Sequence, residues 1–167
     1  MCKVMVNFYN ERTVRWNDGT VILIDQRKLP NRFTHIHCTD HVQIAKAIRN
    51  MNVRGAPAIG VAAAMGLALT ANNSKAKTKK DLMTELEVAG RELTETRPTA
   101  VNLSWAVKRI YNKVLKTDRD MDFLRQMIIK EAECMGEEDI ANCKEIGRHG
   151  SSLLEDGDTV LTHCKWF

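Results

Sequence analysis

The sequence predicts an α+β fold that is mainly α-helical. An Asp-Gly turn signal lies between two short β-rich runs near the amino terminus, and residues from about 40 to 150 carry apolar side chains at helical spacing. A final β-rich run occupies residues 159–164. A strand that follows a helix and a turn usually feeds a parallel sheet. We therefore expect a β unit over residues 1–38, a helical bundle over 39–157, and the first strand of another sheet over 158–167.

The β unit is predicted to be a small antiparallel sheet. Asp18-Gly19 favours the tight turn of a β-hairpin. The next strand would place His35 and His37 on one face and Cys38 on the other. A metal site needs three or four convergent ligands, and no second cluster has ligand spacing, so we expect exposed histidines and no metal. The expected strands are residues 14–16, 20–24 and 33–38.

The helices are predicted from caps and apolar spacing. Thr39 is a plausible N-cap for the first helix, and Thr78 with Asp81 resembles a capping box for the third. The second helix is apolar all round, so it must lie at the centre of the bundle. A break near Gly136 would divide the last helical stretch in two; otherwise it is one long helix. The expected helices are residues 40–50, 57–70, one after Thr78, one after Arg97, and 121–149.

Composition limits the class of protein. The 167 residues include 44% hydrophobic residues, and the formal charge of +4 comes from well-mixed basic and acidic residues, so nothing calls for nucleic acid. Five cysteines without a C-x-x-C pair argue against a disulfide framework and favour a reduced compartment. The most apolar run, residues 56–71, falls short of a membrane span. We expect a soluble cytoplasmic protein that binds neither nucleic acid nor membrane.

The stretch from Arg54 to Gly60 is the main candidate site. Pro57 would be the first residue of the central helix, and Gly55 would allow a tight turn before it. A helix N-terminus presents N–H groups and partial positive charge, and Arg54 adds a donor fork suited to phosphate. The alternative is that Gly55 and Pro57 only separate two packed helices, with Arg54 on the surface.

Arg97 stands before Pro98 in a second stretch of the same kind. Pro98 could begin a helix, so two arginines ahead of helix starts could converge on one anion. Alternatively, Arg97 caps the C-terminus of the preceding helix. A third candidate is Cys164, after His163 at the end of the last predicted strand, where a thiol could be a nucleophile, a proton carrier or a small buried hydrophobe.

Four stretches taken together resemble the methylthioribose-1-phosphate isomerase family. This family shares a superfamily with ribose-1,5-bisphosphate isomerase and the regulatory subunits of the translation initiation exchange factor. The resemblance covers about residues 14–164, with the four stretches in the family's order. They are Asp25–Pro30, Met51–Ala64, Arg97–Leu103 and Leu161–Cys164.

The resemblance implies isomerisation of a phosphorylated pentose from aldose to ketose in methionine salvage, without metal or redox cofactor. It assigns substrate binding to Arg54, Gly55, Ala56 and Arg97, and it places Cys164 at the reaction centre. The family's general acid is an aspartate in a second, Rossmann-like domain, and it has no counterpart here. The family also suggests a homodimer.

The sequence departs from the family pattern directly after Cys164, where Lys165-Trp166-Phe167 replaces Asn-Ala-Gly. We therefore expect the amino-terminal part of such an enzyme, inactive alone, with a homodimer or a separately encoded second half as its partner. Two alternatives stay open: a non-catalytic regulatory module like the initiation-factor subunits, and an isomerase for 5-deoxyribose 1-phosphate or ribose 1,5-bisphosphate.

Overall fold

A three-stranded antiparallel sheet opens the fold. The computed structural model describes residues 11–161, and its sheet has the order β1-β2-β3. Val14 pairs with Leu23 in the first ladder, and Ile22 pairs with His37 in the second. Asp18 and Gly19 both adopt positive φ (43° and 76°), as the predicted hairpin turn requires. The strands are β1 (Val14–Asn17), β2 (Thr20–Ile24) and β3 (His35–Cys38), so the sheet is confirmed and only the third strand is shorter than expected.

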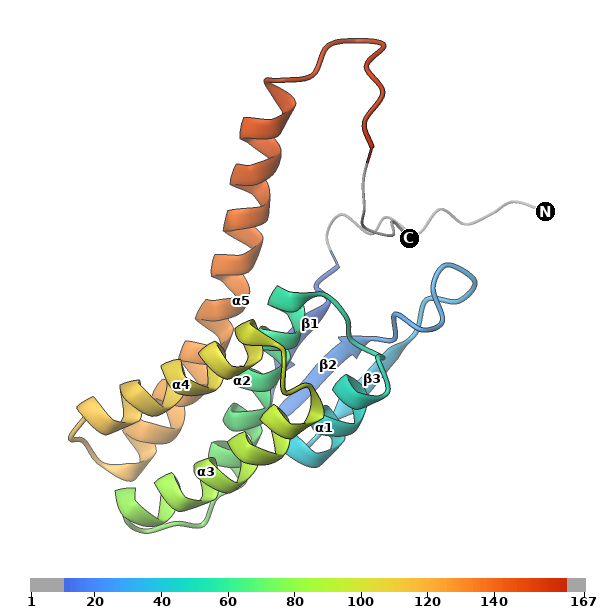
Figure 1. Cartoon of the computed structure of the whole chain (residues 1–167). Coiled ribbons are helices and arrows are strands. Elements are labelled where there is room, and N and C mark those ends of the chain that lie inside the picture. The colour runs from blue at the N-terminus through green and yellow to red at the C-terminus, as the bar shows by residue number, and fades with distance from the viewer. Residues whose placement is uncertain (1–10, 162–167) are drawn as a thin grey trace.

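Five helices follow the sheet and make the described chain mainly helical, which confirms the predicted class (Figure 1). The second of them is the central element, because it contacts the other four helices and both of the first two strands. Its twelve buried residues are mostly alanine, glycine and leucine, and small residues let neighbouring backbones approach closely. The helices are α1 (His41–Arg49), α2 (Ala56–Asn73), α3 (Lys79–Thr96), α4 (Val101–Lys116) and α5 (Met121–Ser151).

One hydrophobic core joins the sheet to the helices. Val21, Leu23 and Cys38 on the sheet are fully buried and belong to the same contact cluster as Leu67 of α2 and Ile110 of α4. Burial raises the pKa of the Cys38 thiol to about 11, so this cysteine behaves as a small protonated hydrophobe. The sheet therefore supports the helix layer directly.

Three of the helices have an N-cap side chain that accepts a hydrogen bond from an amide of the first turn. Asp40, and not Thr39 as predicted, caps α1 by accepting a hydrogen bond from the Gln43 amide at 2.8 Å. Thr78 caps α3 through the Asp81 amide, and the Asp81 carboxylate accepts from the Thr78 hydroxyl at 2.7 Å, which confirms the predicted pairing. Asp120 caps α5 in the same way as Asp40 caps α1.

Two helix starts differ from the prediction: α2 begins one residue earlier than expected, and α4 begins later because a turn precedes it. Ala56 is the first helical residue of α2, and Pro57 is the second. Pro98 does not begin a helix: a turn closed by the Ala100 amide and the Arg97 carbonyl (2.9 Å) intervenes, and α4 begins at Val101. Proline fixes only its own φ, so it is compatible with this turn as well as with a helix start.

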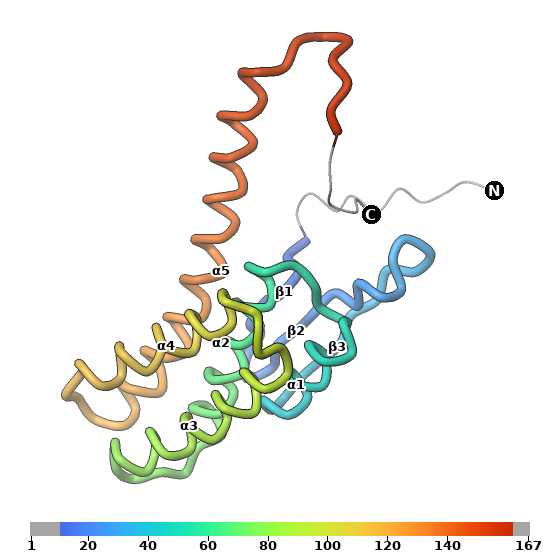
Figure 2. The backbone as a smooth tube through the Cα atoms, viewed as in Figure 1, coloured from blue at the N-terminus to red at the C-terminus, as the bar shows by residue number. Residues whose placement is uncertain are grey.

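The C-terminal part of the described chain, α5 and the residues after it, differs from the prediction in one respect and settles one open alternative. α5 is one continuous helix, since Gly136 remains helical and its Cα faces Val61 of α2. Residues 159–161 are exposed and are not a strand, contrary to prediction, while the rest of that predicted strand and Cys164 lie outside the described residues. The C-terminal half of α5 extends beyond the other elements (Figures 1 and 2). None of the helices within residues 11–161 could cross a membrane.

Candidate anion-binding site

The start of α2 is exposed and lacks a side-chain cap. Gly55 is the N-cap residue at φ 95°, a conformation that residues with a side chain rarely adopt. No acidic residue occupies the first turn, and the Ile59 amide makes the first helical bond to the Gly55 carbonyl at 2.9 Å. The N–H groups of Ala56 and Ala58 precede that bond, so the turn presents amides and the positive end of the helix dipole to solvent.

A polar loop after β2 holds this turn in place. The Arg54 amide donates to Gln26 Oε1 at 2.6 Å, and Arg54 Nη2 donates to the Gln26 carbonyl at 3.2 Å. The Gln26 amide in turn donates to the Asn52 carbonyl at 2.9 Å. Beside it, the buried carboxylate of Asp25 accepts from Asn52 Nδ2 at 2.8 Å and lies 3.5 Å from the Lys28 ammonium.

The start of α4 lies against the start of α2. A Cβ added at Gly60 would lie 2.9 Å from the Asn102 carbonyl oxygen, so only glycine permits this approach. Ala100, the N-cap of α4, makes no side-chain cap bond, and the first turn again has no acidic residue. The two adjacent helix starts are therefore the two without capping side chains, whereas α1, α3 and α5 each have one.

Arg97 occupies the C-cap position of α3, as the alternative interpretation expected. Its amide donates to the Thr94 carbonyl at 3.3 Å, and it lies three residues before the N-cap of α4. The half-buried Arg97 is thus placed between the end of one helix and the start of the next. Whether its guanidinium meets that of Arg54 on a common ligand stays a prediction.

A groove of about 490 Å³ runs beside the paired helix starts. Its α5 wall was not predicted, because the sequence carries no signal that Glu138 and Asp139 would face the starts of α2 and α4. Burial raises the pKa of Asp139, and burial together with Asp139 raises that of the Cys143 thiol, which disfavours a thiolate in this wall. The lining residues include Pro57, Gly60, Val101, Trp105, Glu138 and Ile146.

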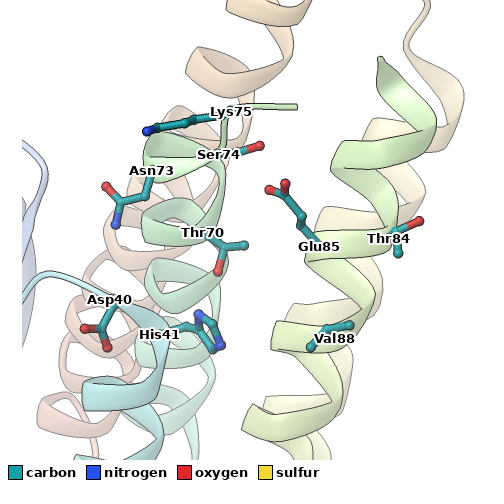
Figure 3. Close-up of a pocket in the computed structure, with 9 residues that line it drawn as sticks. All are labelled: Asp40, His41, Thr70, Asn73, Ser74, Lys75, Thr84, Glu85 and Val88. Carbon is teal, nitrogen blue, oxygen red and sulfur yellow. The ribbon is translucent and has the colours of Figure 1, made fainter. Parts of the chain in front are cut away.

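A second groove, of about 610 Å³, lies at the opposite end of α2 (Figure 3). The imidazole of His41 and the carboxylate of Glu85 point into it. Most of its polar side chains have structural partners: Asp40 caps α1, Asn73 Nδ2 donates to the Thr39 carbonyl at 2.8 Å, and His41 lies 3.1 Å from Glu92. Since the 18 residues of α2 span about 27 Å, this groove is far from Arg54.

Histidine and acidic side chains do not form a metal cluster within residues 11–161. His35 lies 3.7 Å from Glu11 and edge-on to the Phe33 ring at 5.0 Å, while His37 is exposed. His35 therefore has local neighbours, and neither histidine of β3 belongs to a group of metal ligands within residues 11–161.

Comparison with known proteins gives the family. Residues 52–165 match the Initiation factor 2 subunit family, and this match includes both uncapped helix starts. The chain belongs to this family. Among relatives, the methylthioribose-1-phosphate isomerases of Pelotomaculum thermopropionicum and Geobacter sulfurreducens are each 46% identical over 91% and 92% of this chain. Those matches cover 42% and 44% of the relatives, so the chain spans less than half their length.

Two solved structures share the fold. The 5-methylthioribose 1-phosphate isomerase of Pyrococcus horikoshii matches with a TM-score of 0.83 and 42% identity over 87% of this chain and 41% of that one. Subunit delta of the translation initiation factor eIF-2B from A. fulgidus matches with a TM-score of 0.79 and 39% identity over 88% of this chain and 43% of that one. The architecture is thus shared by a protein named as an enzyme and by one named as an initiation-factor subunit.

Proposed function

We propose that this chain forms the phosphate-binding part of an isomerase that converts methylthioribose 1-phosphate to methylthioribulose 1-phosphate. The relatives named as this enzyme, at 46% identity, support the proposal. The reaction would belong to cytoplasmic methionine salvage. In this role Arg54, Gly55, Ala56 and Arg97 bind the substrate, and Cys164 lies at the reaction centre.

The observation that carries the proposal is the pair of adjacent uncapped helix starts, each preceded by an arginine. In α1, α3 and α5 an Asp or Thr side chain accepts from one amide of the first turn, whereas α2 and α4 have no such bond and leave that amide for another acceptor. A phosphate accepts hydrogen bonds from such amides and is favoured by both helix dipoles. An arginine contributes a planar donor fork to the same anion.

Calorimetric titration with methylthioribose 1-phosphate tests the proposal. Arg54→Ala removes a charge-assisted donor, so we expect its Kd to rise by about tenfold or more. Arg49→Ala is the control, because Arg49 is an exposed arginine that ends the neighbouring helix α1, whereas Arg54 is half-buried beside the start of α2. Equal affinities of wild type and Arg54→Ala, or an equal loss in Arg49→Ala, would contradict the assignment.

The second candidate is a non-catalytic regulatory module, and the match to the initiation-factor subunit delta favours it. A scaffold has no physical need for two uncapped helix starts beside two arginines, so we rank it below the enzyme. Binding of purified initiation factor 2 without any heat of binding to the sugar phosphate would reverse this order.

Substrate and assembly are the finer parts of the proposal. Parallel titrations with ribose 1,5-bisphosphate and 5-deoxyribose 1-phosphate would separate the sister isomerases by affinity. We also propose that the active assembly is a homodimer. Light scattering of the purified chain measures its molecular mass in solution and so tests for the dimer.

A further inference from the structure

We infer that Gln26 is a positioning residue for the anion-binding site: it fixes both the backbone and the guanidinium of Arg54. This inference rests on the proposed phosphate-binding role of Arg54. Gln26 contacts Arg54 directly, and its role is to hold that arginine in place rather than to bind the anion itself.

The segment around Arg54 needs an external support. Met51 adopts φ 60° and Gly55 adopts φ 95°, so Arg54 lies between two left-handed residues. Such a segment cannot continue either α1 or a strand, and its amides and carbonyls must find partners outside regular structure. The Asn52 amide reaches back to the Ala47 carbonyl at 2.9 Å, but Arg54 depends on the loop after β2.

Gln26 supplies three separate contacts to this segment. Its side-chain Oε1 accepts from the Arg54 amide at 2.6 Å, and its backbone carbonyl accepts from Arg54 Nη2 at 3.2 Å. Its amide donates to the Asn52 carbonyl at 2.9 Å. One residue thus holds the peptide plane and the side chain of Arg54 together, which fixes the direction in which the guanidinium leaves the turn.

Gln26 is itself held by buried groups. The adjacent Asp25 is 5% exposed, and its amide donates to the Thr34 carbonyl at 2.9 Å. Its carboxylate accepts from Asn52 Nδ2 at 2.8 Å and from the Arg27 amide at 3.3 Å. The support therefore runs from the sheet through Asp25 and Gln26 to Arg54, and a residue supported in this way loses less side-chain entropy when a ligand binds.

Substitutions at Gln26 test the role of its Oε1 acceptor separately from that of the rest of the side chain. Gln26→Met keeps the length but removes Oε1, leaving the two backbone contacts. We expect amide hydrogen exchange at Arg54 to accelerate by about tenfold or more, and the Kd for methylthioribose 1-phosphate to rise by a similar factor. Gln26→Glu restores an acceptor, so it should restore slow exchange; its added negative charge near the phosphate should keep affinity low.

Gln43→Met is the matched control. Gln43 Oε1 accepts from the Thr39 amide at 2.9 Å, the same kind of bond at the start of α1. We expect this variant to leave both the exchange of Arg54 and the affinity unchanged.

Three other results would each overturn the positioning role of Gln26. Unchanged exchange at Arg54 in Gln26→Met overturns the inference and leaves the proposed function standing. Faster exchange with wild-type affinity means that Gln26 orders the loop without serving the site, which also overturns it. If wild type does not bind the sugar phosphate at all, the proposed function fails, and the positioning role fails with it.

Discussion

At the scale of residues, Glu131 is the buried carboxylate that ties α4 to α5. It is 6% exposed, accepts from Arg109 Nε at 2.7 Å and pairs with the Lys113 ammonium. Burial raises the pKa of Glu131, but the hydrogen bonds from Lys113 and Arg109 outweigh it, and the net pKa lies below its ordinary value. The hydrogen bond from Arg109 likewise lowers the pKa of Glu138 to about 2.

Glu131→Gln should lower the free energy of unfolding at pH 7 by about 1–3 kcal/mol, because it leaves two cations facing a neutral amide. The matched control is Glu133→Gln, two residues along the same helix, where the side chain is exposed and the change should stay within about 0.5 kcal/mol. Urea unfolding followed by circular dichroism measures both. Equal effects in the two variants would show that the network adds no stability.

The lowered pKa values of Glu131 and Glu138 predict how the free energy of unfolding changes with pH. Both folded carboxylates have a pKa below the unfolded value of about 4.3, so their contribution is complete above that pH and disappears as the pH falls towards 2. The stability lost by wild type over this interval should be smaller in Glu131→Gln. A variant that loses as much stability as wild type would assign the acid sensitivity to other groups.

At the scale of elements, the site depends on how closely α2 approaches α4. Gly60 allows this approach, because a Cβ there would meet the Asn102 carbonyl at 2.9 Å, and a backbone atom cannot rotate away as a side chain can. For the two uncapped helix starts to share one anion, as we propose, this contact must keep them adjacent.

Gly60→Ala should therefore destabilise the chain by about 1–3 kcal/mol and also weaken sugar-phosphate binding, because α2 and α4 must separate at their starts. Gly147→Ala is the matched control: Gly147 lies in the projecting part of α5 with nothing within 4 Å of an added Cβ. There alanine should stabilise the helix by about 0.5–1 kcal/mol and leave binding unchanged. Thermal unfolding and titration of both variants check the contrast, and a neutral Gly60→Ala would contradict it.

The sequence predicts those elements whose signals are local. The Asp18-Gly19 hairpin, the Thr78–Asp81 pair and the apolar α2 each follow from residues within one turn or one helix, and all three are present. The predicted helix start at Pro98 was wrong, because proline suits a turn as well as a helix start. The hydrogen bond from the Ala100 amide to the Arg97 carbonyl closes a turn there instead. The support from Gln26 joins residues 28 apart, and the groove wall at Glu138 is more distant still, so neither has a local signal.

At the scale of the whole molecule, the paired helix starts lie at an open surface. Gly55, Ala56 and Pro57 are exposed, and Val101 is 78% exposed at the start of α4. Beyond them, the second half of α5 projects with Ile146 71% exposed. The relatives named as isomerases are more than twice as long as the part of them that this chain matches. The described surface therefore leaves the two helix starts open to solvent and does not enclose them.

Isomerisation moves a proton or hydride between adjacent carbons, and this requires positioned acid and base groups in a site from which water is excluded. We therefore expect a polypeptide of these 167 residues to bind methylthioribose 1-phosphate without measurable turnover. Conversion can be followed by ³¹P NMR, with a full-length isomerase relative as the positive control. Turnover by the 167-residue chain that disappears in Cys164→Ala would overturn this expectation, because Cys164 would then act without any further enclosing domain.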